Sequence, residues 1–231
     1  MKKIAIITGA SGNLGKACVS AFLDEDYDVI ATVPPQESLG YNVPDRVIVK
    51  EVDLTNEGDV SRFIADQALQ RSIDCALLLV GGFAMGNIND TSNAQLQKMF
   101  SLNFFTAYHC ARPLFQKMQE QPTGGRIVII GSKPALNPKE GKNAVAYALS
   151  KSLLFDLANI LNAESSEGKV VTHVIAPSVI DTPPNREAMP TADFNAWVTP
   201  EAIASNILWL CSEKGASVRG GVFKLYGGVK E

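Results

Sequence analysis

The sequence contains few cysteines, few histidines and no long apolar run. The four cysteines are widely separated, include no C-x-x-C pair and do not cluster with the two histidines. This spacing argues against a disulfide framework and against a zinc site, so we expect no metal. The residues concerned are Cys18, Cys75, Cys110, Cys211, His109 and His173.

Segments typical of membrane insertion or secretion are also lacking. No stretch approaches the roughly 18 uninterrupted apolar residues of a transmembrane helix. The apolar run that starts at Ile4 breaks at Thr8-Gly9, which is too early for a signal peptide. We therefore expect a cytoplasmic protein without a membrane partner.

Neither charge sign dominates the sequence. The chain carries 21 Lys and Arg residues against 24 Asp and Glu residues, a net charge of −3. No long block of like charges occurs, so nucleic acid is not an expected partner. A small-molecule substrate fits this balance better than a polyanion does.

Short apolar runs alternate with longer segments of helical periodicity. The runs are continuous and rich in β-branched residues, which is typical of strands covered on both faces. The alternation predicts an α/β fold, a Rossmann-type doubly wound parallel sheet of about seven strands, in one domain spanning residues 1–231. The expected strands are Ile4–Thr8, Asp28–Val33, Val47–Lys50, Ala76–Val80, Arg126–Ile130, Val170–Ala176 and Val222–Tyr226; the expected helices are Gly15–Asp24, Glu57–Gln70, Asn93–Gln119, Ala144–Ser165 and Pro200–Cys211.

Several boundaries carry their own signals. Thr55 or Asn56 is expected to cap one helix, and Thr199 before a proline is expected to cap another. Pro113 predicts a bend or break about one turn before it. Residues 178–198 are rich in proline and small polar residues, which predicts a long, irregular and mobile lid with Arg186 as a candidate substrate contact.

Glycines follow the first expected strand directly. They let the backbone approach a pyrophosphate, which the positive end of the next helix can bind. Such a turn alone is weak evidence, because a tight turn without ligand has the same composition. The run reads Thr8-Gly9-Ala10-Ser11-Gly12-Asn13-Leu14-Gly15.

A tyrosine and a lysine stand one helical turn apart, at Tyr147 and Lys151. On one helix face, an ammonium group near a phenol favours the phenolate and lowers the pKa of the tyrosine. That makes Tyr147 a candidate general acid or base. Ser132 follows another expected strand at the edge where the ligand crevice should lie.

Together these positions resemble the short-chain dehydrogenase/reductase family from Lys3 to Gly228. The most specific segment is Tyr147-Ala148-Leu149-Ser150-Lys151, preceded by Ser132 and Asn103. The resemblance implies an oxidoreductase that uses NAD(H) or NADP(H). It implies that Tyr147 exchanges a proton with a carbonyl or alcohol and that Ser132 orients the substrate oxygen. Lys151 would hold the nicotinamide ribose, and Asn103 would anchor a water molecule.

The resemblance also implies further cofactor contacts beyond the catalytic set. Asp53-Leu54 matches the family's adenine-contacting position, and the segment that starts at Pro177 matches the family's P-G-x-x-x-T sequence near the nicotinamide. The full set of implied cofactor residues is Gly9, Ser11, Gly12, Asn13, Leu14, Gly15, Asp53, Leu54, Val80, Gly81, Gly82, Tyr147, Lys151, Pro177, Ile180 and Thr182.

Three segments depart from the family pattern. Asn13 replaces the middle glycine of the turn, where its tolerance of a left-handed conformation could preserve the turn. Residues 78–81 read Leu-Leu-Val-Gly in place of Asn-Asn-Ala-Gly, so support of the sheet must come from elsewhere. Ser178 replaces a glycine. At the position that selects NAD or NADP, Val33 and Pro34 favour neither; Lys16 could approach a 2′-phosphate, but a solvated helix residue is the favoured interpretation.

Some of these segments are similar to dihydropteridine reductase, above all residues 181–194. That pattern lacks the equivalents of Ser132 and Asn103, so ordinary carbonyl or alcohol chemistry is the favoured hypothesis. A pterin reductase and an inactive cofactor sensor are the alternatives. A homo-oligomer, tetramer or dimer, is expected from apolar residues on two long helices: Phe100, Phe104, Phe105, Leu153, Leu154 and Leu157.

Overall fold

The computed structural model describes residues 2–68 and 71–230, in which seven strands form one parallel sheet. The strand order is β3-β2-β1-β4-β5-β6-β7, so the order reverses between β1 and β4. This is the predicted doubly wound fold, and the strand bounds agree with the sequence to within about two residues. The strands are β1 (Ile4–Ile7), β2 (Asp28–Val33), β3 (Val47–Glu51), β4 (Cys75–Leu78), β5 (Gly125–Ile130), β6 (Val170–Pro177) and β7 (Val222–Leu225).

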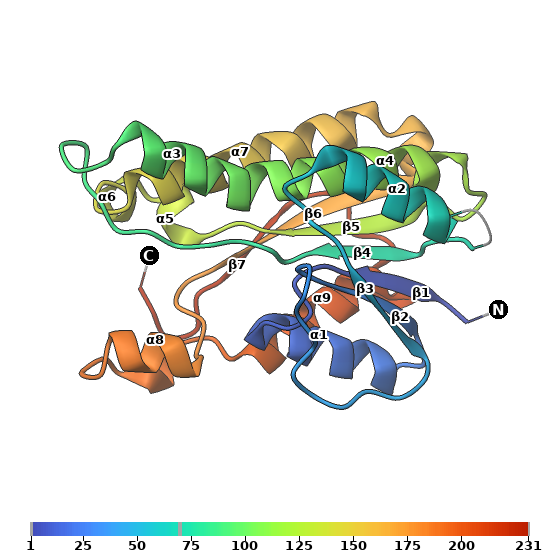
Figure 1. Cartoon of the computed structure of the whole chain (residues 1–231), viewed down its shortest axis with the longest axis horizontal. Coiled ribbons are helices and arrows are strands. Elements are labelled where there is room, and N and C mark those ends of the chain that lie inside the picture. Colours follow the sequence, from blue (N-terminus) through green and yellow to red (C-terminus); the bar gives the residue numbers. More distant parts are fainter. Residues whose placement is uncertain (1, 69–70, 231) are drawn as a thin grey trace.

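Helices cover both faces of this sheet (Figure 1). One layer holds α2 (Glu57–Ala68), α4 (Thr106–Glu120) and α7 (Val145–Glu164), and the other holds α1 (Asn13–Asp24) and α9 (Pro200–Cys211). Each layer buries its own apolar cluster against the sheet. The remaining helical segments are α3 (Asn93–Phe100), the π-helical turn η1 (Ser101–Phe105), α5 (Lys133–Leu136), α6 (Pro138–Gly141), η2 (Ser166–Gly168), α8 (Pro183–Ala188), η3 (Phe194–Ala196) and η4 (Glu213–Gly215).

The helix ends confirm two of the expected caps. The Asn56 side chain accepts hydrogen bonds from the amides of Gly58 and Asp59, and Thr199 accepts one from Ala202. The expected helix over 57–70 is observed to Ala68, and its predicted end at Gln70 lies outside the described residues. Within the described residues, no helix is long and apolar enough to cross a membrane.

The break predicted one turn before Pro113 is wrong. Helix α4 continues through Pro113, and the departure from α-helical geometry lies earlier, in η1. Proline removes one backbone hydrogen bond to the preceding turn. The helix tolerates this loss because it is packed against the sheet through Cys110, Ala111 and Leu114 on either side of the proline.

The prediction that residues 178–198 form a long irregular segment is also wrong. Residues 178–198 contain α8 and η3. The segment closes on itself, because the Asp181 amide donates to the Val198 carbonyl and the Val198 amide donates to the Val179 carbonyl. Two prolines at the start of α8 fix the backbone angles that a first helical turn requires. We call residues 178–198 the lid.

Because of the buried His173 on β6, we expect the stability of the fold to decrease in acid. Both ring nitrogens are buried without a hydrogen-bond partner in residues 2–68 and 71–230, and burial together with the charge of Arg126 lowers the pKa of His173 from 6.5 to about 4. The unfolded chain binds this proton more tightly, so the free energy of unfolding should fall as the pH drops from about 6.5 to about 4. The loss should approach about 3 kcal/mol.

Urea unfolding at several pH values measures this loss. In His173→Leu, the decline between pH 6.5 and pH 4 should be smaller than in the wild type. His109→Asn, the matched control, should retain the decline. An equal decline in all three proteins would contradict the assignment to His173.

Candidate active site

Four side chains expected to carry the chemistry come together at the carboxyl edge of the sheet. Tyr147 and Lys151 lie one turn apart on α7, Ser132 follows β5, and Asn103 lies in the π turn η1. The π turn re-aims the side chains of its helix, and such turns are frequent at functional sites. Asn103, Ser132 and Lys151 are buried, and Tyr147 is half-buried.

Lys151 is held against the end of β5. Its Nζ donates to the Ile130 carbonyl oxygen at 2.7 Å, and burial lowers the pKa of the ammonium group to about 8. A Cβ atom on Gly81 would lie 3.0 Å from this Nζ and 2.6 Å from Asn103 Oδ1. Gly81 therefore leaves the room that both polar groups occupy after β4.

Asn103 connects the segment after β4 to α7. Its Oδ1 accepts from the Gly82 amide at 2.8 Å, and its Nδ2 donates to Ser150 Oγ at 2.9 Å. Ser150 in turn donates to the Tyr147 carbonyl oxygen at 2.8 Å. This chain of bonds fixes the backbone that carries the tyrosine.

The hydroxyl groups of Tyr147 and Ser132 lie close together but have different surroundings. Burial raises the pKa of Tyr147, and the nearby Ser132 hydroxyl lowers it in part. Lys151, expected from the sequence to lower the pKa of Tyr147, is not among the groups that shift it, and its ammonium donates to the Ile130 carbonyl oxygen. Ser132 Oγ is buried and makes no hydrogen bond of normal length and angle to any described residue. A substrate oxygen placed there would give it a partner.

The glycine turn after β1 has the shape that a pyrophosphate needs. Gly9 adopts φ +65°, so the left-handed position is Gly9, whereas Asn13 is the first helical residue and needs no such tolerance. A Cβ atom on Gly15 would lie 2.2 Å from the Gly9 carbonyl oxygen, so only glycine allows this close packing. Gly12 caps α1 without a side chain, which leaves the first amides of α1 accessible to an anion.

The missing asparagines after β4 have an identifiable replacement. Thr8 Oγ1 donates to the Leu77 carbonyl oxygen and accepts from the Leu79 amide at 3.0 Å. This buried hydroxyl joins β1 to β4 at the point where the strand order reverses. Val80 lies beside Gly9, since a Cβ atom there would meet Val80 Cγ2 at 3.1 Å.

Other implied cofactor residues lie along the same edge. Asp53 follows β3 and accepts from the Thr55 amide and hydroxyl, whereas Leu54 is buried. Pro177 ends β6. Ile180 forms an isolated bridge with Val198, and Thr182 precedes α8 as its N-cap. Ser11 and Leu14 belong to the glycine turn and the start of α1.

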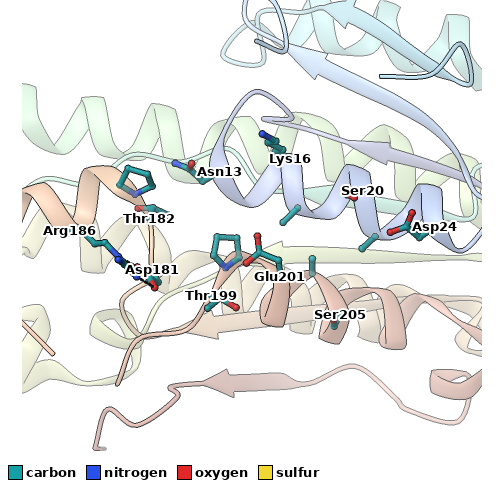
Figure 2. A pocket seen from close by; sticks show the side chains of 15 residues that line it. Asn13, Lys16, Ser20, Asp24, Asp181, Thr182, Arg186, Thr199, Glu201 and Ser205 are labelled. Atoms are coloured by element: carbon teal, nitrogen blue, oxygen red, sulfur yellow. Dashed lines mark hydrogen bonds and ion pairs between the residues drawn. The ribbon is translucent and has the colours of Figure 1, made fainter. Parts of the chain in front are cut away.

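A groove of about 760 Å³ runs between α1 and α9 and reaches the lid (Figure 2). Of the implied cofactor residues, only Asn13 and Thr182 line it, so most of the groove lies outside the expected dinucleotide path. Arg186 makes a two-pronged ion pair with Asp181, at 2.6 and 2.7 Å, and stacks over the Phe194 ring. Arg186 therefore organises the lid through Asp181 and Phe194, and it also lines the groove.

Comparison with known proteins decides the family. The family model described as short chain dehydrogenase matches residues 3–193. The chain belongs to the short chain dehydrogenase family. It is therefore an oxidoreductase of a family that uses nicotinamide cofactors, as the sequence resemblance implies.

Similar proteins cover the whole length of this dehydrogenase. An acetoacetyl-CoA reductase from Acinetobacter sp. is 26% identical over 99% of this chain and 98% of its own. The uncharacterized oxidoreductase YohF from Escherichia coli is 26% identical over 92% of this chain and 90% of its own. The structure of ElxO with NADP bound has a TM-score of 0.89 at 22% identity, over 99% of this chain and 98% of its own.

Two side chains of this dehydrogenase were not singled out from the sequence. Ser150 links Asn103 to Tyr147, a role that its place between Tyr147 and Lys151 could have suggested. Phe83 packs edge-on against the Tyr147 ring, with centroids 4.9 Å apart, yet it is 61% exposed. An exposed aromatic ring beside Tyr147 leaves no trace in local sequence periodicity.

Proposed function

We propose that this dehydrogenase transfers a hydride between a nicotinamide and a small carbonyl or alcohol substrate, with Tyr147 as general acid or base. The observation that supports it most is the unpartnered Ser132 hydroxyl facing Tyr147. A carbonyl oxygen in that space would accept from both hydroxyls. The raised pKa keeps Tyr147 protonated at neutral pH, as the reductive direction requires.

Each residue has a distinct task in this proposal. The bound nicotinamide supplies or accepts the hydride. Tyr147 gives its proton to the substrate oxygen, and Ser132 donates a second hydrogen bond that holds the same oxygen. Lys151 binds the nicotinamide ribose with its ammonium group. Asn103 anchors the water molecule that returns a proton, while its amide holds Gly82 in place.

The cofactor in this proposal is NAD(H) or NADP(H). Residues of the turn from Gly9 to Gly15 hold the pyrophosphate, Asp53 and Leu54 contact the adenine, and Pro177, Ile180 and Thr182 contact the nicotinamide end. Lys16 remains close to the turn, since its Nζ lies 5.3 Å from the centroid of the Tyr41 ring, and Tyr41 donates to the Ala10 carbonyl oxygen. Fluorescence titration with NADH and NADPH measures both affinities.

A quinonoid dihydropterin is the second candidate substrate. The exposed Phe83 ring beside Tyr147 favours it, because a planar heterocycle can stack on such a ring. The activity assay should therefore compare this pterin with aldehydes, ketones and quinones, each with NADH and NADPH. Cofactor binding without consumption in any of these assays would support the inactive sensor instead.

Ser132→Ala separates the two substrate classes. For a carbonyl substrate, loss of the positioned hydroxyl should lower kcat by about 10²-fold, with unchanged cofactor affinity. Steady-state kinetics and the cofactor titration measure the two quantities. A rate within two-fold or so of the wild type would remove the role of Ser132 and favour the pterin substrate.

A homo-oligomer, tetramer or dimer, belongs to the same proposal, but the contact residues need correction. Leu154 and Leu157 face the sheet and are buried, so they cannot form an interface. Phe105 of the expected set is exposed at the end of η1, and further apolar side chains are exposed on α4 and α7: Tyr108, Leu149 and Ile160. Large exposed apolar residues on neighbouring helices favour self-association.

Light scattering tests this expectation at micromolar concentration. The wild type should elute as a dimer or tetramer, and Ile160→Glu, which places a charge on a side chain that is 64% exposed, should shift it toward the monomer. A wild-type monomer would contradict the proposed assembly.

A cytoplasmic location completes the proposal and is compatible with all four cysteines being free and buried.

A further inference from the structure

Lys133 is a buried lysine directly after Ser132. Its side chain is only 6% exposed, and its Nζ lies 2.5 Å from Glu140 Oε1 in α6. The same Nζ donates to the Lys230 carbonyl oxygen at 2.6 Å and lies 5.4 Å from the centroid of the Tyr226 ring. A carboxylate, a carbonyl oxygen and an aromatic face thus surround one ammonium group, which satisfies a buried charge.

Residues 226–230, which we call the strap, connect this lysine to the lid. The Gly228 amide donates to the Ala196 carbonyl oxygen at 3.0 Å. Gly227 adopts φ +59°, and a Cβ atom there would lie 2.7 Å from the same oxygen, so the strap packs directly on the backbone of η3. Ser178 Oγ, at the start of the lid, donates to the Tyr226 carbonyl oxygen. Figure 1 shows this end of the chain between α5 and α8.

Ser132 needs such an anchor because its side chain has none. Its hydroxyl makes no hydrogen bond of normal length and angle to a described residue, so its position depends chiefly on the backbone on either side. Upstream, Lys151 holds the Ile130 carbonyl oxygen at 2.7 Å. Downstream, Lys133 begins α5 and is the next side chain with a fixed position. The serine lies between these two ammonium groups.

We propose that Lys133 is a positioning residue that holds Ser132 at the substrate oxygen and, through the strap, couples this position to the lid. The assignment rests on the proposed role of Ser132 in carbonyl chemistry. It adds a group that does not touch the substrate. It also links the start of α5 to the lid, two segments that are far apart in the sequence.

A double-mutant cycle tests how Lys133 acts. Lys133→Met keeps the length of the side chain and removes the charge, and it should lower kcat/KM by about 10-fold to 100-fold, because a small misplacement of a positioned group is costly. If Lys133 acts through Ser132, the variant that combines Lys133→Met with Ser132→Ala should be no slower than Ser132→Ala alone. Multiplied losses would indicate a general structural effect and would overturn the assignment.

Two further variants complete the cycle. Glu140→Gln, which removes the partner carboxylate and keeps the buried lysine, should show a smaller loss with the same dependence on Ser132. It remains informative if Lys133→Met does not fold. Lys139→Met on the exposed face of α6 is the matched control and should keep wild-type kinetics. Wild-type kinetics in both Lys133→Met and Glu140→Gln would overturn the proposal.

The connection to the lid has a test that needs no turnover. Arg186 in α8 is 53% exposed in its side chain and is a trypsin site. Lys133→Met should be cleaved there about 10-fold faster than the wild type or Lys139→Met, because loss of one anchor loosens the strap and the lid. Unchanged cleavage would refute the coupling. Ser132→Ala could leave turnover unchanged while Lys133→Met is still cleaved faster at Arg186. The proposed role of Ser132 would then be wrong, but the coupling between Lys133 and the lid would stand.

Discussion

Replacing Tyr147 with phenylalanine is expected to lower kcat by about 10²–10⁴-fold and to leave cofactor affinity within a few-fold of the wild type. The substitution removes only the hydroxyl to which the proposed mechanism assigns the proton exchange. The ring keeps its edge-on contact with Phe83, and the backbone of residue 147 keeps its bond to Ser150. Steady-state kinetics and fluorescence titration with the reduced cofactor separate the two effects.

The pH dependence gives Tyr147 a second readout. Because burial raises the pKa of this phenol, Tyr147 should keep its proton through neutral pH, and the part of the fall in reductive rate that depends on its hydroxyl should appear at high pH. The residual rate of Tyr147→Phe should lack this fall. Tyr108→Phe, on α4 outside the site, is the matched control. Wild-type turnover in Tyr147→Phe would overturn the mechanism for every substrate.

Replacing Lys151 with methionine is expected to damage binding and turnover together. The variant removes a buried ammonium group that donates to the Ile130 carbonyl oxygen and leaves that oxygen without its donor. In the proposed function the same ammonium group binds the nicotinamide ribose. A hydrogen bond to a charged group contributes about 1.5–3 kcal/mol, so its loss should lower cofactor affinity by about 10-fold to 100-fold. The rate should fall in addition, because the segment before Ser132 loses its upstream anchor.

The comparison between the two variants identifies the task of Lys151. Tyr147→Phe should change kcat alone, whereas Lys151→Met should change kcat and the dissociation constant of the cofactor. Lys142→Met, an exposed lysine just before α7, is the matched control. Unchanged cofactor affinity in Lys151→Met would show that another group binds the ribose, and the role proposed for this lysine would then be wrong.

Most of the fold could be predicted because it depends on local pattern. Continuous apolar runs such as Ile127–Ile130 are typical of strands buried on both faces, and the glycines after β1 mark a turn that packs against α1 where Gly15 leaves no room for a side chain. The course of the chain around Pro113 could not be predicted. Whether a helix tolerates the proline depends on packing by Cys110 and Leu114 against the sheet, which the local sequence does not contain.

In the candidate site too, some contacts follow from local spacing and others depend on the tertiary structure. Tyr147 and Lys151 share a helix, so their spacing alone places them together. Lys133 meets Glu140, Tyr226 and Lys230 only after the sheet has formed, and a lysine beside a serine predicts nothing by itself. The hydrogen bond from the Lys151 ammonium to the Ile130 carbonyl oxygen could not be predicted either, because it joins α7 to the end of β5.

The segment between Gly82 and Gly86 has a consequence for how this enzyme can change. Its ends are fixed by hydrogen bonds: the Gly82 amide donates to the Asn103 side-chain Oδ1, the Gly86 amide donates to the Asn143 carbonyl oxygen, and the Gly86 carbonyl oxygen accepts from the Val145 amide. Phe83 and Met85 between them are more than half exposed. Mutation can therefore vary these two side chains at a small cost in folding, mainly the contact of Phe83 with the Tyr147 ring. Under the proposed function, new substrate preferences can evolve, or be selected in a library, while Ser132, Tyr147 and Lys151 stay constant.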